Sequence, residues 1–147
     1  MGPLTAHAAM HLHHIGYVVE SIENALPGLL RSLGANWDGY IFEDPYQKVR
    51  AAFLSTDRLD AQIELIQPTA DDSPVSKFLQ ERGGGLHHCC FEVQSLDESI
   101  STMRKEGALL AKRPRPAVAF GGRLIAWLLT PEKLLVELLQ KGTNVNG

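Results

Sequence analysis

Two stretches of the chain, residues 12–19 and 86–93, consist mostly of apolar positions and are predicted to form β-strands. Each is followed by a serine, Ser21 or Ser95, and by acidic residues in the next few positions. A serine at this point can accept a hydrogen bond from the free amides of a helix N-terminus, which acidic side chains also favour. The pattern therefore predicts a strand followed directly by a helix, twice in the chain.

Glycine and proline positions predict where the helices begin and end. The two helices run towards Gly34 and Gly107, since glycine readily adopts the left-handed conformation that follows a helix end. Pro27 interrupts the first helical pattern, so we expect it to kink that helix or to delay its start. A serine cap followed by proline predicts a further helix over residues 73–81, which the glycines at 83–85 would end.

Shorter apolar stretches after the first two helices predict the remaining strands. They span residues 40–43, 49–55 and 61–66 in the first half of the chain, and residues 123–129 and 134–139 in the second. This order of strand, helix and further strands indicates an α+β fold rather than an alternating parallel sheet.

The chain also repeats itself at an offset of 74 residues. The shift places HHIGYVVESIENAL (13–26) over HHCCFEVQSLDESI (87–100), and AFLST (52–56) over AWLLT (126–130); with one residue fewer, IELIQ (63–67) falls on VELLQ (136–140). Three matches in the same order indicate a duplicated βαβββ module. The predicted organisation is a flexible tail (1–10), a first module (11–70), a linker helix with a glycine-rich turn (71–85), a second module (86–141) and a C-terminal tail (142–147).

The duplication pairs His14 with His88 on the first strands, and Glu64 with Glu137 on the last strands. A curled sheet built from two such modules brings these equivalent positions together on its concave face. Glu137 has apolar neighbours on both faces of its strand, where a carboxylate is costly unless it is neutralised or coordinated. Any one of these histidines alone would be read as a hydrogen-bonded core residue, but the matched set predicts one divalent ion per chain: Zn, Co, Mn or Ni.

The register decides which histidine of each doublet is the ligand. In regular strands His13 and His87 would point to the face opposite His14 and His88, so we choose the second of each pair; a slip of one residue would reverse the choice. Cys90 shares the face of His88, and we expect it to be a small buried side chain rather than a ligand.

Composition narrows the class of protein. The chain has 147 residues, of which 44% are hydrophobic, enough for one ordinary domain, and no apolar run approaches the roughly 20 residues of a membrane-spanning helix. The net charge is −3, with one short basic stretch at residues 112–115, which disfavours nucleic-acid binding. Cys89 and Cys90 are adjacent and cannot form an ordinary disulfide with each other, so we expect a cytoplasmic location.

The sequence resembles the vicinal oxygen chelate superfamily, which includes glyoxalase I, methylmalonyl-CoA epimerase, extradiol dioxygenases and antibiotic-resistance proteins. It is most similar to the epimerases, through HHIGYVV (13–19), IELIQP (63–68), DSPVSKFLQERGGGLHHCCFEV (72–93) and VELLQ (136–140). The resemblance implies a fold of two βαβββ modules that form a curled mixed β-sheet cup. It also implies that His14, Glu64, His88 and Glu137 hold the metal.

The activity implied by the resemblance is proton transfer next to a carbonyl, through an enolate that the metal stabilises. Glu64 and Glu137 would act as bases, on a small acyl or 2-oxo substrate such as a CoA or other thioester, in a homodimer. One alternative is a glyoxalase I-like lyase acting on thiol adducts, which a glutamate at position 64 resembles more closely, since some epimerases have glutamine there. The other is a non-catalytic protein that binds a small molecule, as in antibiotic resistance.

The epimerases carry a glutamate just before the third strand, where this chain has EDPYQKVRAAF (43–53). Aligning residues 49–53 places Tyr46 or Gln47 there, with Glu43 and Asp44 too early. We therefore expect Tyr46 to act as the acid, with Lys48 orienting a substrate carboxylate; the alternative is that both are ordinary surface residues.

The loop RPRPAVAFGGR (113–123) is rich in proline and glycine and is predicted to cover the mouth of the cup. In this loop Phe120 and Gly121 would approach the substrate, and Arg123 would hold an anionic group. A simple hairpin connection is the alternative.

Overall fold

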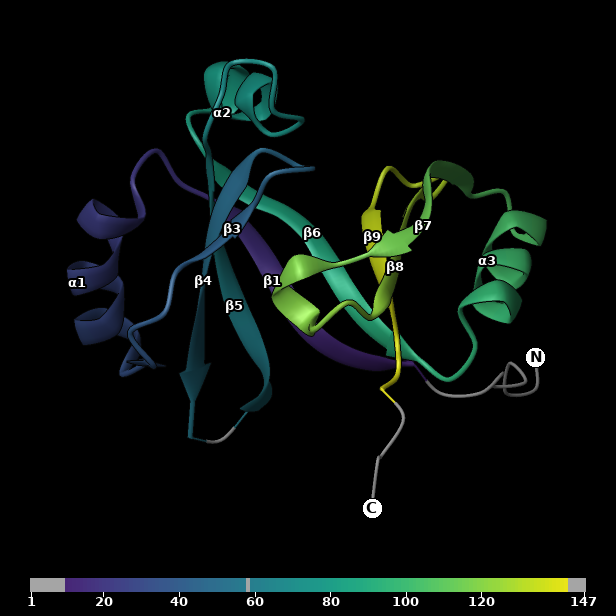
Figure 1. Cartoon of the computed structure of the whole chain (residues 1–147), viewed down its shortest axis with the longest axis horizontal. Coiled ribbons are helices and arrows are strands. Elements are labelled where there is room, and N and C mark those ends of the chain that lie inside the picture. Colours follow the sequence, from purple (N-terminus) through teal and green to yellow (C-terminus); the bar gives the residue numbers. More distant parts are fainter. Residues whose placement is uncertain (1–9, 58, 143–147) are drawn as a thin grey trace.

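The computed structural model describes residues 10–57 and 59–142, so the two predicted tails lie almost entirely outside the described residues. The first half of the described chain contains β1 (His11–Val18), α1 (Ile22–Leu33), β2 (Asn36–Trp37), β3 (Phe42–Asp44), β4 (Val49–Thr56) and β5 (Leu59–Pro68). After α2 (Ser76–Arg82), the second half contains β6 (Gly85–Val93), α3 (Leu96–Lys105), β7 (Leu109–Pro116), the 3-10 helix η1 (Val118–Phe120), β8 (Leu124–Leu129) and β9 (Leu135–Gln140). Figure 1 shows these elements.

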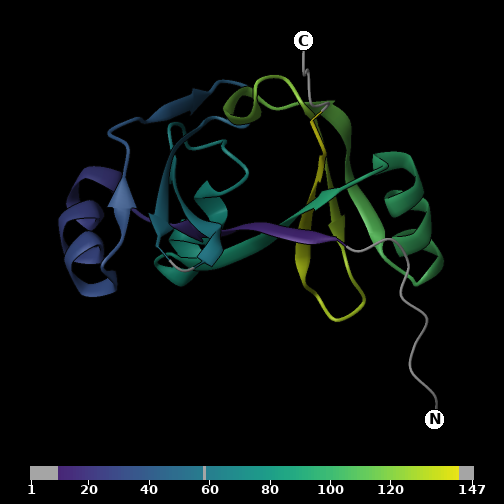
Figure 2. The same ribbon diagram turned by 90° about the horizontal axis from the view of Figure 1, so that it is seen from below.

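The strands form one mixed sheet in the order β2-β4-β5-β1-β6-β9-β8-β7, and β3 pairs with β4. β1 and β6 are antiparallel at its centre, while β5 runs parallel to β1 and β9 runs parallel to β6. The sheet curls into a cup, with α1 and α3 outside it at opposite ends and with β3 approaching η1 across the open side (Figure 2). The predicted α+β fold, a curled cup made of two related halves, is thus confirmed, while the module boundaries at 11–70 and 86–141 stay a prediction.

Each outer helix covers the convex side of its own half. Ile22 and Leu26 of α1 pack against Leu54 and Leu65, whereas Leu96 of α3 belongs to the equivalent cluster in the second half. Because side chains alternate along a strand, burying one set on the convex side turns the other set towards the inside of the cup. The concave face is therefore free to carry polar residues.

The predicted helix ends are largely confirmed. Ser21 Oγ accepts a hydrogen bond from Asn24 N (3.1 Å), Ser95 Oγ accepts one from Glu98 N (3.3 Å), and Gly34 is left-handed. The prediction that Pro27 delays the start of α1 is wrong, because the helix begins at Ile22 directly after its cap. Pro27 lies inside α1, where its missing amide hydrogen costs the helix one backbone hydrogen bond.

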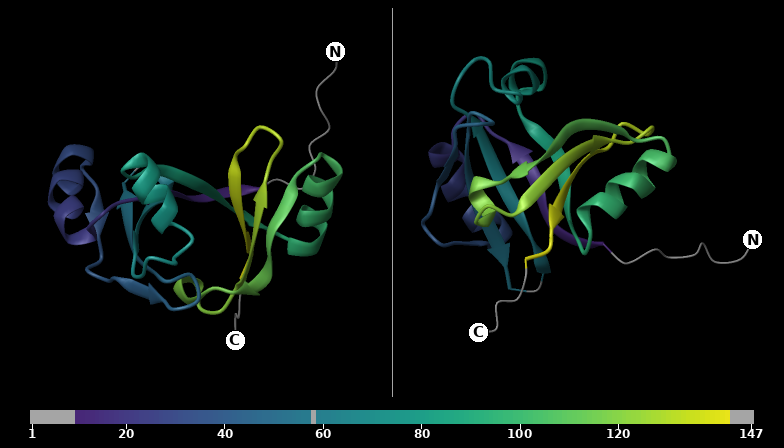
Figure 3. Two further views of the ribbon diagram at one scale, coloured as in Figure 1. Left: turned by 90° about the horizontal axis from the view of Figure 1, so that it is seen from above. Right: turned by 45° about the vertical axis from the view of Figure 1, so that its right-hand side comes forward.

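Two further boundaries differ from the prediction. The linker helix begins at Ser76 rather than Ser73, because Ser73 Oγ donates a hydrogen bond to Gln47 O and ties this segment to the β3–β4 turn instead of capping a helix. In the right-hand view of Figure 3, α2 lies at the top, beyond the strands of the cup. Only the start of the predicted loop at 113–123 is strand, because β7 extends to Pro116, whereas η1 and the glycines after it form a turn. Prolines are tolerated here because β7 is an edge strand.

No helix among the described residues combines the length and the apolar character needed to cross a bilayer.

Candidate metal centre

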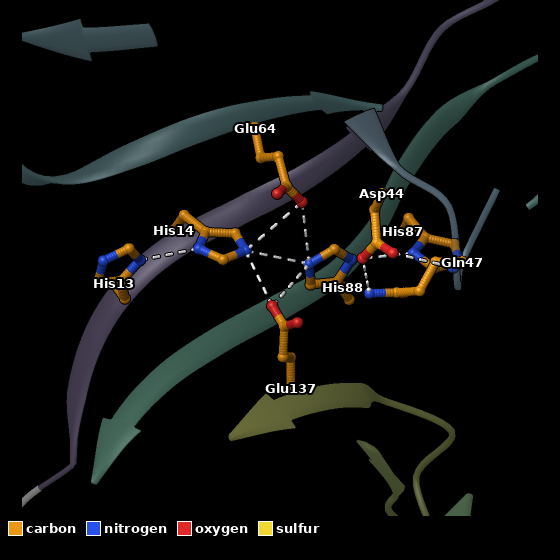
Figure 4. Close-up of polar contacts among 8 residues, drawn as sticks. All are labelled: His13, His14, Asp44, Gln47, Glu64, His87, His88 and Glu137. Carbon is orange, nitrogen blue, oxygen red and sulfur yellow. Dashed lines mark hydrogen bonds and ion pairs between the residues drawn. The ribbon is translucent and has the colours of Figure 1, made fainter. Parts of the chain in front are cut away.

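The four predicted ligands meet on the concave face, one from each of the four central strands (Figure 4). All four side chains are buried. His14 Nε2 on β1 lies 3.1 Å from Glu137 Oε1 and 3.6 Å from Glu64 Oε1. His88 Nε2 on β6 lies 3.5 Å and 3.6 Å from the same two oxygens, and the two Nε2 atoms are 3.2 Å apart.

The strand register explains this convergence. Gly16 lies opposite Glu64 of β5 on one side and His88 of β6 on the other. In the adjacent row, Cys90 lies opposite His14 on one side and Glu137 on the other. Each row thus places a small residue between one glutamate and one histidine, and Gly16 and Cys90 are themselves equivalent in the 74-residue repeat.

These donor atoms fit a divalent cation. Two donors on one zinc ion at tetrahedral angles are separated by about 3.4 Å, and the five histidine–histidine and histidine–glutamate separations above range from 3.1 to 3.6 Å. His14, His88 and Glu137 form the group whose donor atoms all lie within 4.8 Å of one another. Among the described residues, Glu137 Oε1 makes no hydrogen bond of acceptable geometry although it is buried. A buried carboxylate oxygen of this kind needs a cation or a donor to offset its lost hydration.

The electrostatics of the cluster distinguish its two glutamates. Burial raises the pKa of Glu137, but the imidazoles of His14 and His88 outweigh it and hold the pKa at about 2. At Glu64, burial outweighs the same imidazoles and raises the pKa. With both carboxylates ionised and both imidazoles neutral, the ligand set carries two negative charges, which a dication would balance.

Gly16 makes room for one of the imidazoles. A Cβ atom built on Gly16 would lie 2.1 Å from Cε1 and 2.4 Å from Nδ1 of His88, far inside van der Waals contact. His88 can therefore occupy its position only because residue 16 has no side chain.

Replacing Gly16 by alanine should push the His88 ring out of place and weaken divalent-ion binding by about 10- to 100-fold. Titration of the metal-free protein with Zn²⁺ against a chromogenic chelator measures this loss. Gly28→Ala is the matched control, because a Cβ at Gly28 on α1 meets no atom within 4 Å. Equal affinities for the two variants would show that His88 does not depend on Gly16.

A cavity lies beside the ligands and is lined by both halves of the chain. Its walls are mostly apolar, and its aromatic side chains include Phe42, Phe120 and Trp127. Trp127 contacts the His88 ring edge-on at 4.6 Å between centroids, and its repeat partner Phe53 contacts His14 in the same way at 5.5 Å. The four predicted ligands therefore lie beside a cavity with mostly apolar walls, as small-molecule sites commonly have.

Comparison with known proteins places this architecture in a family. Residues 13–127 match the family described as the Glyoxalase/Bleomycin resistance protein/Dioxygenase superfamily. The chain belongs to this superfamily. The resemblance found in the sequence is thus confirmed.

Three relatives of this superfamily member cover nearly its whole length. It is 34% identical to Uncharacterized protein YqjC of Bacillus subtilis over 92% of this chain and 96% of that protein. It is 28% identical to an ethylmalonyl-CoA/methylmalonyl-CoA epimerase of Cereibacter sphaeroides, over 88% and 96% of the two chains. The crystal structure of methylmalonyl-CoA epimerase from Mycobacterium tuberculosis superposes with a TM-score of 0.82 at 25% identity, covering 97% and 95%.

Of the other residues that the sequence proposed for this superfamily member's site, only Phe120 lines the cavity. Tyr46 is 70% exposed in the β3–β4 turn, and Lys48 forms an ion pair with Asp72. Gly121 follows η1 in a left-handed turn. Arg123 does not line the cavity either, because its guanidinium bonds Glu92 Oε2 at 2.7 Å.

Asp44 lines the cavity, although the sequence alignment placed it too early. The β3–β4 hairpin is tight, so Asp44 pairs with Val49 and shares its inward face. Asp44 Oδ1 accepts hydrogen bonds from Tyr46 N (2.9 Å) and Gln47 N (3.1 Å), and Gln47 Nε2 donates to Oδ2 (3.0 Å). The Asp44-Pro45 pair, a common start of a turn, is the sequence signal that could have identified this strand end.

The faces predicted for His13 and His87 are wrong. The register between β1 and β6 shifts at both points, leaving each of these residues without a cross-strand partner. Such β-bulges turn the extra side chain away from regular alternation. His13 Nδ1 consequently lies 2.8 Å from His14 Nδ1, and His87 Nδ1 lies 2.9 Å from His88 Nδ1 (Figure 4).

Proposed function

We propose that this protein is a divalent-metal-dependent epimerase that moves a proton next to the carbonyl of an acyl thioester. The observation that carries the proposal is the His14–His88–Glu137 group, with Glu64 Oε1 3.6 Å from both imidazoles, at the wall of a mostly apolar cavity that Asp44 also lines. The similarity to two named acyl-CoA epimerases over most of the chain supports the same reaction class.

The four clustered side chains would hold the ion. When bound, the ion supplies Lewis-acid stabilisation of the negative charge that develops on the carbonyl oxygen as the neighbouring carbon loses its proton. The apolar walls exclude water, which strengthens these electrostatic interactions and protects the enolate. Phe120, which stacks on His14 with ring centroids 5.6 Å apart, forms part of this wall.

An epimerase needs one group that removes the proton and another that returns it from the opposite face. We assign these roles to Asp44 and Glu64, which both line the cavity and come from different strands. In the metal-free cluster, burial raises the pKa of Glu64, whereas the two imidazoles lower that of Glu137, which favours Glu64 as the proton acceptor of the pair. Asp44 replaces Tyr46 of the sequence prediction, since the Tyr46 ring is exposed.

Metal-loaded protein incubated with methylmalonyl-CoA in D2O should incorporate deuterium at the α-carbon, and a chelator should abolish the exchange. Proton NMR measures the exchange against a protein-free sample that contains the same metal. No exchange by the metal-loaded protein would contradict epimerase activity on this compound.

A glyoxalase I-like lyase is the second candidate, favoured by the presence of glutamate rather than glutamine at position 64. The hemithioacetal of methylglyoxal and a thiol is its diagnostic substrate. Turnover of this adduct without exchange of methylmalonyl-CoA would select the lyase, and neither reaction would select the non-catalytic binding protein. The homodimer and the cytoplasmic location stay predictions from the sequence.

A thioester of coenzyme A would bring phosphate groups to the rim of the cup, where Lys112 and Arg115, two of the three cations of β7, lie. Lys112 pairs with Trp127 and Arg115 pairs with Ile125, so both face inward with these cavity residues. Burial and the charge of Arg115 lower the pKa of Lys112. Among the described residues neither cation forms an ion pair, which leaves both available to an anionic ligand.

Replacing Lys112 and Arg115 together by glutamine should raise the KM for methylmalonyl-CoA about tenfold with little change in kcat, since phosphate binding is remote from the reacting carbon. The KM for methylmalonyl-pantetheine, which lacks the phosphates, should not change. Arg113→Gln on the same strand is the control, because Arg113 is exposed and has no partner on β8. Equal increases in KM for both substrates would contradict a phosphate subsite.

A further inference from the structure

Both ligand imidazoles have a second imidazole directly behind them. His13 and His87 occupy equivalent β-bulges, and the Nδ1–Nδ1 separations within the two doublets are 2.8 Å and 2.9 Å. Figure 4 shows His13 on the far side of His14, and His87 on the far side of His88, relative to the two carboxylates. The same irregularity thus produces the same contact in each half of the chain.

The protonation state of a ligating imidazole determines which ring donates and which accepts in this contact. His14 and His88 both present Nε2 to Glu64 and Glu137, so Nε2 is the ligand atom. A neutral imidazole that ligates through Nε2 carries its proton on Nδ1, and that N–H is a donor. The Nδ1 of His13 or His87, at hydrogen-bond distance, is then the acceptor, and the outer ring carries its own proton on Nε2.

The outer rings are held in place by aromatic contacts. His13 meets the Phe120 ring edge-on, with centroids 5.2 Å apart and an interplanar angle of 86°. His87 meets the Phe78 ring in the same way, at 5.1 Å and 90°. An acceptor fixed by packing restricts the orientation of the ring that donates to it.

We propose that His13 and His87 are positioning residues, which fix the Nδ1–H tautomer and the ring orientation of His14 and His88 for metal binding. The inference rests on the proposed metal site but not on the substrate. Hydrogen-bonded partners of this type behind a ligating histidine typically contribute 10- to 100-fold to metal affinity.

The His13–His14 pair has an alternative role, as part of a second metal site. Donor atoms of His13, His14 and Cys90 lie within 4.8 Å of one another and so form a second potential ligand cluster. Burial raises the pKa of the Cys90 thiol, which disfavours the thiolate that a metal would need. The second half of the chain has no matching cluster among the described residues, whereas the paired imidazoles occur in both halves.

The experiment compares leucine and asparagine at each position. Leucine removes the acceptor, whereas the Oδ1 of asparagine lies near the place of Nδ1 and can accept the same hydrogen bond. His13→Leu and His87→Leu should each lower Zn²⁺ affinity by about 10- to 100-fold, and His13→Asn and His87→Asn should remain within about threefold of wild type. Chelator competition gives the affinities, and thermal unfolding of the metal-free variants checks that they fold.

Two further measurements separate a positioning role from a purely structural one. Nitrogen-15 NMR of the zinc-loaded protein should show protonated Nδ1 atoms at His14 and His88, and the leucine variants should disturb these signals. His11→Leu is the control, because His11 lies on the same strand, exposed and outside the cluster. Metal content should remain near one equivalent per chain in every variant.

Three results would overturn the inference. These are unchanged affinity in the leucine variants, equal losses with asparagine and leucine, and a second bound equivalent that disappears in His13→Leu. A wild-type protein that binds no divalent ion would overturn both this inference and the proposed function. Metal binding that follows the expected pattern without proton exchange on any thioester would reject the proposed function alone.

Discussion

Replacing Glu137 by glutamine should weaken divalent-ion binding by about 100-fold or more. Glu137 Oε1 is buried and lies within 3.5 Å of the Nε2 atoms of both His14 and His88. Removing one charged member of a buried ionic group costs about 3–5 kcal/mol, and each 1.4 kcal/mol corresponds to a factor of ten. Competition with a chromogenic chelator, using Zn²⁺ and Co²⁺, measures the loss.

Glu92→Gln is the matched control for this substitution. Glu92 is a partly buried glutamate on β6, but its carboxylate bonds Arg123 rather than the cluster. Its loss should leave metal affinity unchanged. If Glu137→Gln binds the ion as tightly as this control, Glu137 is not a ligand.

In the metal-free protein, Glu137 and Glu64 should affect the free energy of unfolding in opposite directions. The pKa of Glu137 is lowered from 4.5 to about 2, so its ionised form stabilises the fold above pH 4.5, and this contribution is lost as the pH falls towards 2. The pKa of Glu64 is raised, so its ionised form opposes folding at any pH above that raised value. At neutral pH, chemical denaturation should find Glu137→Gln less stable than wild type, and Glu64→Gln more stable, although both lose metal affinity.

The sequence predicts the ligand set because the module is duplicated. A single buried histidine or glutamate has an ordinary structural explanation, but the repeat relates His14 to His88 and Glu64 to Glu137 at once. Equivalent positions meet when they lie near the axis that relates the two copies, and the strands that carry these four residues are the central strands of the sheet. The alternation of side chains along the strands then indicates the concave face.

The parts that the sequence did not predict depend on local departures from this regularity. Regular alternation sends His13 and His87 to the wrong face, because a β-bulge has no signature in the pattern of apolar positions. Prolines suggested a loop at 113–116, yet an edge strand can accommodate them because its outer amides need no partner. The sequence alignment placed Asp44 too early, because the length of the turn that follows it is defined only by the pairing of β3 with β4.

Replacing Asp44 by asparagine should reduce α-proton exchange by about 100- to 10,000-fold, the usual contribution of a positioned general base, while metal affinity stays unchanged. Asparagine keeps an Oδ1 that can accept the hydrogen bonds from Tyr46 N and Gln47 N, so the turn should persist. The substitution removes the basic carboxylate from the cavity and, with it, the acceptor of the Gln47 Nε2 hydrogen bond. Exchange in D2O and chelator competition on the same preparation measure both quantities.

Tyr46→Phe is the control that tests whether Asp44 or Tyr46 transfers the proton. The Tyr46 side chain is 70% exposed and does not line the cavity, so losing its hydroxyl should leave the exchange rate unchanged. A fall in rate for Tyr46→Phe together with a normal rate for Asp44→Asn would restore the tyrosine as the acid and leave Asp44 as a turn residue. The two substituted residues are two positions apart in one hairpin, so a disturbed turn would lower the exchange rate of both variants. Loss of the group that transfers the proton should lower the rate of one variant only.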